Sequence, residues 1–179
     1  MPNAKQLISG ILSNPFYVCT GIIAISVFSL ASAYTAQYIF GLQPCVLCLY
    51  QRAPYFAAAL LALIGLIAAP QKPKISAALI LICAIAFLCG SVIAAYHTGV
   101  ELHWWKSFLE GCQVNFNVAE GDDILASIQS QSAVRCDEIP WSDPILKLSM
   151  ANYNAVLSFI YAAFSLAGSI LVTRKSNGF

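Results

Sequence analysis

Two cysteines three residues apart form the part of this sequence best suited to chemistry. Cys45 and Cys48 lie in Pro44-Cys45-Val46-Leu47-Cys48, where one long apolar segment has ended and another begins. Thiols at this spacing can close a small disulfide ring and can exchange with other disulfides. At a membrane boundary, such a pair is placed to pass electrons between a protein in water and a lipid-soluble molecule. The motif therefore points to redox chemistry.

Two other interpretations compete with this one. In the first, Cys45 and Cys48 are half of a tetrahedral zinc site, which His97 and His103, the two histidines of the sequence, would complete. In the second, the pair is a static disulfide, although a bond across so short a loop contributes little chain entropy. We favour the redox interpretation and expect no bound metal.

The other five cysteines divide by their surroundings. Cys19, Cys83 and Cys89 lie in apolar segments, where a free thiol behaves as a small apolar side chain. Cys112 and Cys136 lie in a polar segment and are far enough apart to close a sizeable loop, so a stabilising disulfide is the simplest interpretation. If they share one face of a membrane with the first pair, exchange between the two pairs becomes the alternative.

The composition is that of an integral membrane protein. The chain has 59% hydrophobic and 9% charged residues, far from the roughly 25% charged residues of soluble domains. The stretch between Lys5 and Arg52 has no charged side chain and would measure about 70 Å as one helix, more than twice the ~30 Å hydrocarbon core. It must turn back, and Gly41-Leu42-Gln43-Pro44 is the expected turn. Nothing in the charge pattern indicates a nucleic-acid partner.

Polar residues divide the chain into four apolar spans, each near the ~20 residues that a membrane-crossing helix needs. We expect spans at 16–40, 46–69, 75–96 and 150–173, and a long loop at 97–149. The predicted fold is an all-α integral membrane protein, a four-helix transmembrane bundle forming one domain over 1–179. A competing interpretation takes Ala31-Ser32-Ala33 as a signal-peptidase site, but the apolar run continues to Phe40 and cleavage would leave three spans.

Charge placement predicts the orientation in the membrane. Basic residues near span ends stay cytoplasmic, whereas acidic residues have little influence. With four spans, five basic residues fall on one side, which we expect to be the cytoplasmic side with both termini: Lys5, Lys72, Lys74, Arg174 and Lys175. The two cysteine pairs then share the outer side with the loop. All eight acidic residues, from Glu101 to Asp143, are expected in that loop.

An arginine follows the cysteine pair. A helix that begins at Pro44, a residue suited to the first helical position, places Cys45 and Cys48 beside unpaired backbone N–H groups, where the helix dipole favours a thiolate. Arg52 then lies one turn beyond Cys48 on the same face. A guanidinium at this depth either snorkels to the interface or stabilises a nearby negative charge, such as a thiolate or a reduced quinone oxygen.

Other polar residues lie at a similar depth. His97 ends the third predicted span, where it either bonds to interfacial water or hydrogen-bonds and protonates a quinone oxygen. Asn152 and Asn154, near the start of the fourth span, are expected to bond between helices.

Four segments together resemble a known family. They are PCVLCLYQR at 44–52, YHTGVE at 96–101, CDEIPW at 136–141 and LSMANYN at 148–154. In their order and residues they are similar to the bacterial DsbB proteins, which are membrane enzymes that reoxidise the periplasmic dithiol oxidase DsbA at the expense of quinone. The resemblance spans most of the chain.

The resemblance implies a relay in the bacterial inner membrane. Reduced DsbA would attack Cys112, whose partner is Cys136, and Cys136 would then pair with Cys45. Cys48 would be left as a thiolate facing bound ubiquinone or menaquinone. Arg52 would stabilise that thiolate and the developing negative charge on the quinone, and His97 is implied as the second contact to the quinone.

The sequence departs from the family pattern in places, and other functions remain as alternatives. The segment 107–111, Lys147 and Asn152 differ from many relatives, which puts the docking surface for DsbA in doubt, and Gln51 replaces an acidic residue of some members, so we assign it no role.

A vitamin K epoxide reductase-like enzyme is one alternative function, although its active pair follows the loop cysteines in chain order. A four-span organiser similar to tetraspanins is another, but the sequence has no Cys-Cys-Gly.

Overall fold

The structure is a computed structural model that describes residues 4–109, 112 and 135–178. Within these residues the regular structure is helical, and the β pairing is one isolated bridge between Ser142 and Ser149. The helices are α1 (Ala4–Leu12), α2 (Pro15–Tyr38), α3 (Val46–Tyr50), α4 (Ala53–Ala68), α5 (Pro73–Glu101) and α7 (Met150–Ser176).

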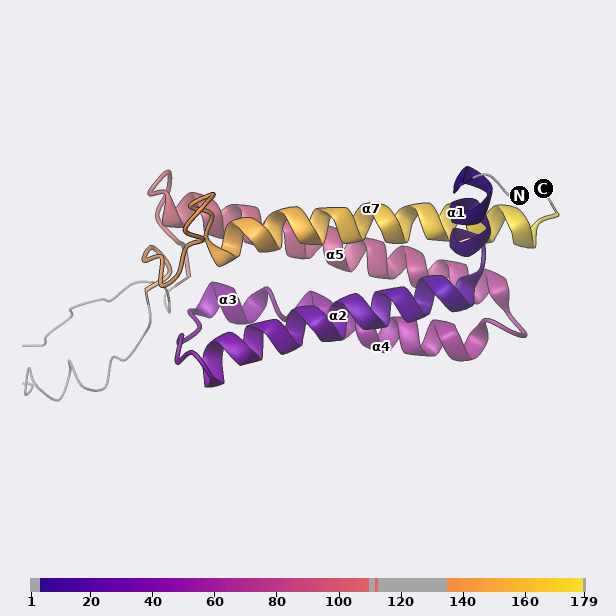
Figure 1. The fold of residues 1–179 in the computed structure, drawn as a ribbon, viewed down its shortest axis with the longest axis horizontal. Coiled ribbons are helices and arrows are strands. Elements are labelled where there is room, and N and C mark those ends of the chain that lie inside the picture. Colours follow the sequence, from indigo (N-terminus) through magenta and orange to yellow (C-terminus); the bar gives the residue numbers. More distant parts are fainter. Residues whose placement is uncertain (1–3, 110–111, 113–134, 179) are drawn as a thin grey trace, which may run out of the picture.

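The predicted fold class is confirmed. Four segments are long and apolar enough to cross a membrane: Pro15–Tyr38, Val46–Ala68, Pro73–Glu101 and Met150–Ser176. Figure 1 shows them as a bundle whose two chain ends lie together at the end that carries α1. The third helix is longer than predicted, since it runs past Tyr96 to Glu101. The prediction that the loop starts at residue 97 and holds Glu101 is therefore wrong, and Glu101 belongs to α5.

The second span is interrupted beside the cysteine motif. α3 ends at Tyr50, Gln51 and Arg52 form a turn, and α4 begins at Ala53. Pro54 explains this break, because its ring clashes with the carbonyl of the residue four positions earlier, Tyr50, and offers no N–H to bond it. The predicted helix start at Pro44 is also corrected: α3 begins at Val46, Cys45 is its N-cap, and Pro44 precedes the cap.

Small residues let the helices approach closely, as is usual in membrane bundles. A Cβ on Gly90 of α5 would lie 3.2 Å from Pro54, and a Cβ on Gly168 of α7 would lie 2.7 Å from Val18 of α2. An apolar cluster in the core of the bundle includes Ile22, Ile80 and Phe87. Large apolar side chains also cover the outer surface, as expected where lipid replaces water; examples are Phe28, Ile67 and Val92.

The two ends of the bundle differ. The end with both chain termini carries α1, which the sequence analysis did not predict, together with the start of α5 and the basic end of α7. The opposite end carries α3, the end of α5, the start of α7 and the described residues that follow α5 and precede α7 (Figure 1). All four cysteines of the predicted relay lie at this second end.

Candidate redox site

The Cys-x-x-Cys pair forms the first turn of α3. Because Cys45 is the N-cap, its Sγ accepts a hydrogen bond from the backbone N–H of Cys48 at 3.2 Å. The two Sγ atoms are 2.7 Å apart, and both cysteines are free thiols. The side chain of His97 approaches from α5, with Nε2 at 3.5 Å from the Sγ of Cys45. Three groups that can donate a hydrogen bond therefore surround one sulfur atom.

This convergence favours a thiolate at Cys45. The hydrogen bond from the Cys48 side chain, helped by His97 and by the Cys48 backbone N–H, lowers the pKa of Cys45 despite burial, which acts in the opposite direction. Within the pair, the donors at the helix start therefore favour the charged form of Cys45, the N-cap.

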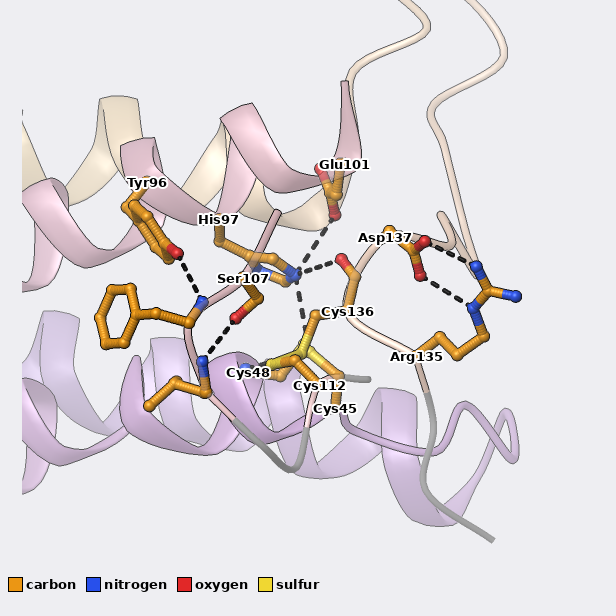
Figure 2. The surroundings of a disulfide bond; sticks show 12 residues. Cys45, Cys48, Tyr96, His97, Glu101, Ser107, Cys112, Arg135, Cys136 and Asp137 are labelled. Atoms are coloured by element: carbon orange, nitrogen blue, oxygen red, sulfur yellow. Dashed lines mark hydrogen bonds and ion pairs between the residues drawn. A yellow bond between two sulfur atoms is a disulfide. The ribbon is translucent and has the colours of Figure 1, made fainter. Parts of the chain in front are cut away.

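The second cysteine pair lies against the first. Cys112 and Cys136 are joined by a disulfide, and both belong to a buried cluster with Cys45, Leu47 and Val100. His97 connects the two pairs, because its Nε2 lies 3.2 Å from the carbonyl oxygen of Cys136 as well as 3.5 Å from the Sγ of Cys45 (Figure 2). The structure thus brings together the four cysteines that the sequence singled out.

The carbonyl of Cys136 also fixes the hydrogens of the surrounding network. A carbonyl only accepts, so the Nε2 of His97 must carry a hydrogen, and the Nδ1 of neutral His97 is then an acceptor. Nδ1 accepts from the Nε2 of Gln51 at 2.8 Å, and the Oε1 of Gln51 accepts from the Nδ2 of Asn154 at 2.6 Å. The Oδ1 of Asn154 accepts from the hydroxyl of Tyr55 at 2.5 Å. One chain of donors therefore holds His97.

Gln51 is thus a site residue that sequence reasoning missed. It was given no role because it departs from an acidic residue of some relatives, yet it is buried and joins α3 to α5 and α7. The signal available in the sequence was its place between Cys48 and Arg52. Asn154 bonds between helices as predicted, whereas the prediction for Asn152 is wrong, because it donates to Ser149, the N-cap of its own helix.

A buried carboxyl group lies on the other side of His97. Glu101 is 5% exposed, and its Oε1 lies 3.9 Å from the Nε2 of His97, one helical turn away. Its Oε2 accepts a hydrogen bond from the hydroxyl of Ser149 at 2.5 Å, which ties the end of α5 to the start of α7. Sequence reasoning counted Glu101 with the acidic residues of the loop. The signal it missed was the i, i+4 spacing from His97, which puts both side chains on one face if the helix continues.

Arg52 and Cys48 face the same cavity. This cavity has a volume of about 330 Å³, and its polar lining includes Cys48, Arg52, His97, Glu101 and Asn154. The lining also includes apolar side chains from α2 and α7, among them Phe28, Leu30, Met150 and Leu157. The guanidinium of Arg52 is held from α2, since Nη1 donates to Gln37 at 2.7 Å and Cζ lies 4.8 Å from the centre of the Tyr34 ring.

The structure does not assemble the four-residue zinc site considered from the sequence. Donor atoms of Cys45, Cys48 and His97 lie within 4.8 Å of one another. His103 lies elsewhere, with its exposed ring 4.0 Å from the Oδ2 of Asp137. The nitrogen of His97 that faces the sulfurs also carries a hydrogen, as argued from Cys136, and so has no lone pair for a metal in this arrangement.

A membrane bundle that gathers two cysteine pairs at one end, with a cavity beside one of them, is the arrangement expected of a membrane thiol oxidoreductase. Comparison with known families agrees: the family model "Disulfide bond formation protein DsbB" matches residues 17–168. The chain belongs to this family. It is therefore a membrane protein of disulfide bond formation, as the resemblance predicted.

Individual relatives support the same assignment. The chain is 29% identical over 168 residues to "Disulfide bond formation protein B" of Aromatoleum aromaticum (strain DSM 19018 / LMG 30748 / EbN1), with 91% of each chain covered. It is 32% identical over 162 residues to "Uncharacterized protein RP370" of Rickettsia prowazekii (strain Madrid E), with 87% of each covered. A shorter match, 36% identical over 78 residues, is to "Disulfide bond formation protein B" of Neisseria meningitidis serogroup A / serotype 4A (strain DSM 15465 / Z2491), covering 44% of this chain and 48% of the relative. No solved structure matches the chain significantly.

Proposed function

We propose that this protein reoxidises a DsbA-like dithiol protein of the periplasm and passes the electrons through its two cysteine pairs to a membrane quinone. The observation that carries the proposal is that Cys45, Cys112 and Cys136 lie in one buried cluster while Cys48 lines the cavity. One pair is thus in contact with the loop, and its second sulfur faces a cavity suited to a lipid-soluble acceptor. This arrangement supports a relay over a static clip.

The proposed exchange uses each sulfur in turn. A thiolate of the donor protein attacks Cys112, breaks the Cys112–Cys136 bond and releases Cys136 as a thiolate. In the oxidised form of the first pair, Cys136 then attacks Cys45, forms a Cys45–Cys136 bond and releases Cys48. The second thiolate of the donor protein breaks the bond to Cys112, completes the donor's own disulfide and releases Cys112. Cys112 then attacks Cys136, restores the Cys112–Cys136 bond and releases Cys45. Cys45 and Cys48 are then both reduced, and re-forming their bond passes two electrons to the acceptor. The donors around Cys45 help because they also make it a good leaving group when the Cys45–Cys136 bond is broken again.

His97 is the group that supports exchange between the pairs. Its N–H reaches both the Sγ of Cys45 and the carbonyl of Cys136, so it holds the two exchanging cysteines next to each other. Gln51 and Asn154 fix the orientation of the ring. The role of this network is positional: it keeps an N–H directed at the sulfur on which negative charge appears.

The lining of the cavity fits a quinone ring. Pockets of roughly 300–1,000 Å³ with mostly apolar walls and a few polar groups are usual for small molecules, and the cavity here has that size and lining. Arg52 offers N–H donors beyond the one that Gln37 takes, which suits a carbonyl oxygen. A quinone such as ubiquinone or menaquinone supplies a two-electron acceptor, and Arg52 and His97 are the residues proposed to hold it beside Cys48.

The proposal includes an orientation in the bacterial inner membrane. Lys72, Lys74, Arg174 and Lys175 belong to the end of the bundle with the chain termini, and basic residues favour the cytoplasmic side. The end with the four cysteines then faces the periplasm, where the disulfide chemistry is oxidising. A DsbA-like partner would meet the protein on that side.

A reconstituted reaction tests the proposal. Purified protein in detergent receives a reduced DsbA-like protein and a soluble quinone, and we expect loss of partner thiols in proportion to quinone consumed. Cys48→Ser should reduce quinone consumption to background, because no thiolate then faces the cavity. Cys89→Ser, which changes an exposed thiol of α5, is the matched control and should keep the turnover of the parent. Unchanged turnover in Cys48→Ser would sink the proposal.

A further inference from the structure

Glu101 is a buried acid that the relay described above leaves without a task. It is the one carboxyl group that lines the cavity within the part of the chain that the structure describes. Its contacts there are the hydroxyl of Ser149 at 2.5 Å and the ring of His97 at 3.9 Å. Among the described residues, no lysine or arginine forms an ion pair with it. A buried carboxyl without a cationic partner is costly when ionised and needs an explanation.

Helix stability does not explain Glu101. The last residue of a helix is a poor place for an acid, because the negative end of the helix dipole lies there. The hydrogen bond with Ser149 ties α5 to α7, but an uncharged amide would accept the same bond at a lower desolvation cost. A carboxyl group at this position is therefore better explained by its ability to gain and lose a proton.

His97 is a weak candidate for the same task. Its Nε2 carries the hydrogen shared with Cys45 and the carbonyl of Cys136, and its Nδ1 is occupied by the amide of Gln51. To take a second proton, the ring needs the amide of Gln51 to reverse, and the amide of Asn154 to reverse with it. With the amides in this orientation, His97 is neutral. Glu101, one turn further along α5, is therefore the better candidate to hold a proton at the cavity.

We propose that Glu101 holds the proton that accompanies the electrons from Cys45 and Cys48 to the acceptor in the cavity. The inference rests on the proposed function and adds a residue to it. When the Cys45–Cys48 bond forms, the two thiols lose two electrons and two protons, and a quinone gains two of each. We assign one proton to Glu101, which takes it from the cysteine pair and gives it to an acceptor oxygen. The other proton of the cysteine pair leaves to water at the loop end, and water supplies the second proton that the acceptor gains.

Several groups face Glu101 and share in its titration. His97 lies on its own helix, Cys45 and Cys48 approach from α3, and Ser149 approaches from the start of α7. The positive guanidinium of Arg52 lines the same cavity. Any pH dependence assigned to Glu101 must therefore be shown by a change of that residue, with the other five intact.

Three variants separate a proton carrier from a structural tie. Glu101→Gln keeps an oxygen that accepts from Ser149 but cannot hold a proton. Glu101→Asp keeps a carboxyl group on a shorter side chain. Ser149→Ala removes the hydrogen bond and leaves the carboxyl in place. All three are measured as full-length protein in detergent, with reduced partner and soluble quinone in excess, across a range of pH.

We expect kcat of Glu101→Gln to fall by about 10²-fold, the usual loss when a group that transfers protons is removed, and its pH profile to lose one limb. Glu101→Asp should recover part of kcat together with that limb. Ser149→Ala should keep both limbs of the pH profile, with the limb of Glu101 shifted because its hydrogen bond is lost. If Ser149→Ala loses as much kcat as Glu101→Gln, or if Glu101→Gln keeps the parent profile, the proton role is overturned.

A second readout needs no quinone. Infrared difference spectra compare quinone-free protein with the Cys45–Cys48 pair oxidised and reduced by a small dithiol. We expect a change in the carboxyl stretching band on reduction, present in the parent and in Ser149→Ala and absent in Glu101→Gln. A band that persists in Glu101→Gln assigns the proton to another group and overturns the inference. This spectrum also decides the matter if the low activity of a variant is due to poor folding.

The two proposals fail separately. If the parent consumes no quinone, the proposed function fails, whatever Glu101 does. If the parent consumes quinone and Cys48→Ser does not, while Glu101→Gln matches the parent in kcat, pH profile and infrared band, only the inference about Glu101 fails.

Discussion

Two pairs of thiols in this bundle show how differently a membrane protein can treat the same side chain. Cys19 and Cys83 lie fully buried in the core, between α2, α4 and α5. Cys45 and Cys48 lie at the start of α3, also largely shielded from solvent. Burial therefore does not distinguish the inert pair from the proposed reactive pair.

The neighbours of each sulfur make the difference. The thiol of Cys83 points its hydrogen at the carbonyl of Ala58, at 3.5 Å, and a carbonyl can only hold the group as a thiol. Cys45 instead faces donors, namely the backbone N–H of Cys48 and the ring N–H of His97. Donors stabilise a thiolate, and the thiolate is the nucleophile. Reactivity in this fold thus follows from whether a sulfur meets donors or acceptors.

The largest effect expected from this difference is on turnover. Cys45→Ser should remove quinone-linked oxidation of the partner by at least about 10³-fold, because loss of one member of a catalytic unit removes most of its rate enhancement. Cys83→Ser should leave turnover within about twofold, since its hydroxyl donates to the same carbonyl of Ala58. Stopped-flow measurement of partner thiols gives both rates. Comparable losses in the two variants would remove the distinction between the pairs.

The next effect concerns the cavity beside Cys48. Arg52→Ala should raise the apparent KM for quinone by roughly 10–100-fold, the equivalent of a hydrogen bond to a charged group. Formation of the mixed disulfide between Cys112 and the partner should persist, because Cys112 lies in the buried cluster and does not line the cavity. Gln37→Ala is the matched variant: it loosens the guanidinium without removing it and should raise KM less. Equal quinone kinetics in Arg52→Ala and the parent would count against the assigned role of Arg52.

A smaller effect is expected on the titration of Cys45. Because its donors lower the pKa of Cys45, the thiolate is present above that lowered pKa and is lost as the pH falls through it. In the reduced protein, Cys45 should therefore react with a small alkylating reagent at pH values below the range of ordinary thiols. His97→Phe removes one donor and should move the midpoint upward. Site-resolved mass spectrometry measures the alkylation of Cys45 at each pH. An unmoved midpoint would show that His97 does not stabilise the thiolate.

Much of this arrangement could be predicted from the sequence, because long-range hydropathy and cysteine spacing are strong signals. The four spans follow from apolar length, and their ends differ from the predictions mostly by a few residues. The four cysteines could be placed at one end because two spans separate the two pairs, which returns the chain to the same side of the membrane. The break after Tyr50 was also within reach, since Pro54 clashes with a continuous helix.

Other features could not be read from spacing alone. The role of Gln51 depends on the directions of two side chains on other helices, His97 and Asn154, which no local pattern encodes. Glu101 was assigned to the loop because acids normally mark the end of a membrane span, yet here the helix continues to that acid and buries it. Polar networks in a membrane are a property of the packed bundle, so they appear only once the helices are in place.

The smallest expected effect tests the other half of the comparison, that Cys19 acts as packing. A Cβ on Gly65 of α4 would lie 3.1 Å from the Sγ of Cys19. Cys19→Ala should therefore lower stability by about 1 kcal/mol through the small space it leaves, and Gly65→Ala should lower it by crowding the sulfur. In the double variant the new methyl group occupies the space of the lost sulfur, so the two losses of stability should partly cancel.

Thermal unfolding in detergent measures the stability of the two single variants and the double variant, while turnover serves as the control and should stay near that of the parent in all three. Additive losses would mean that the two side chains do not share one space, and a fall in turnover would mean that Cys19 has a role beyond packing.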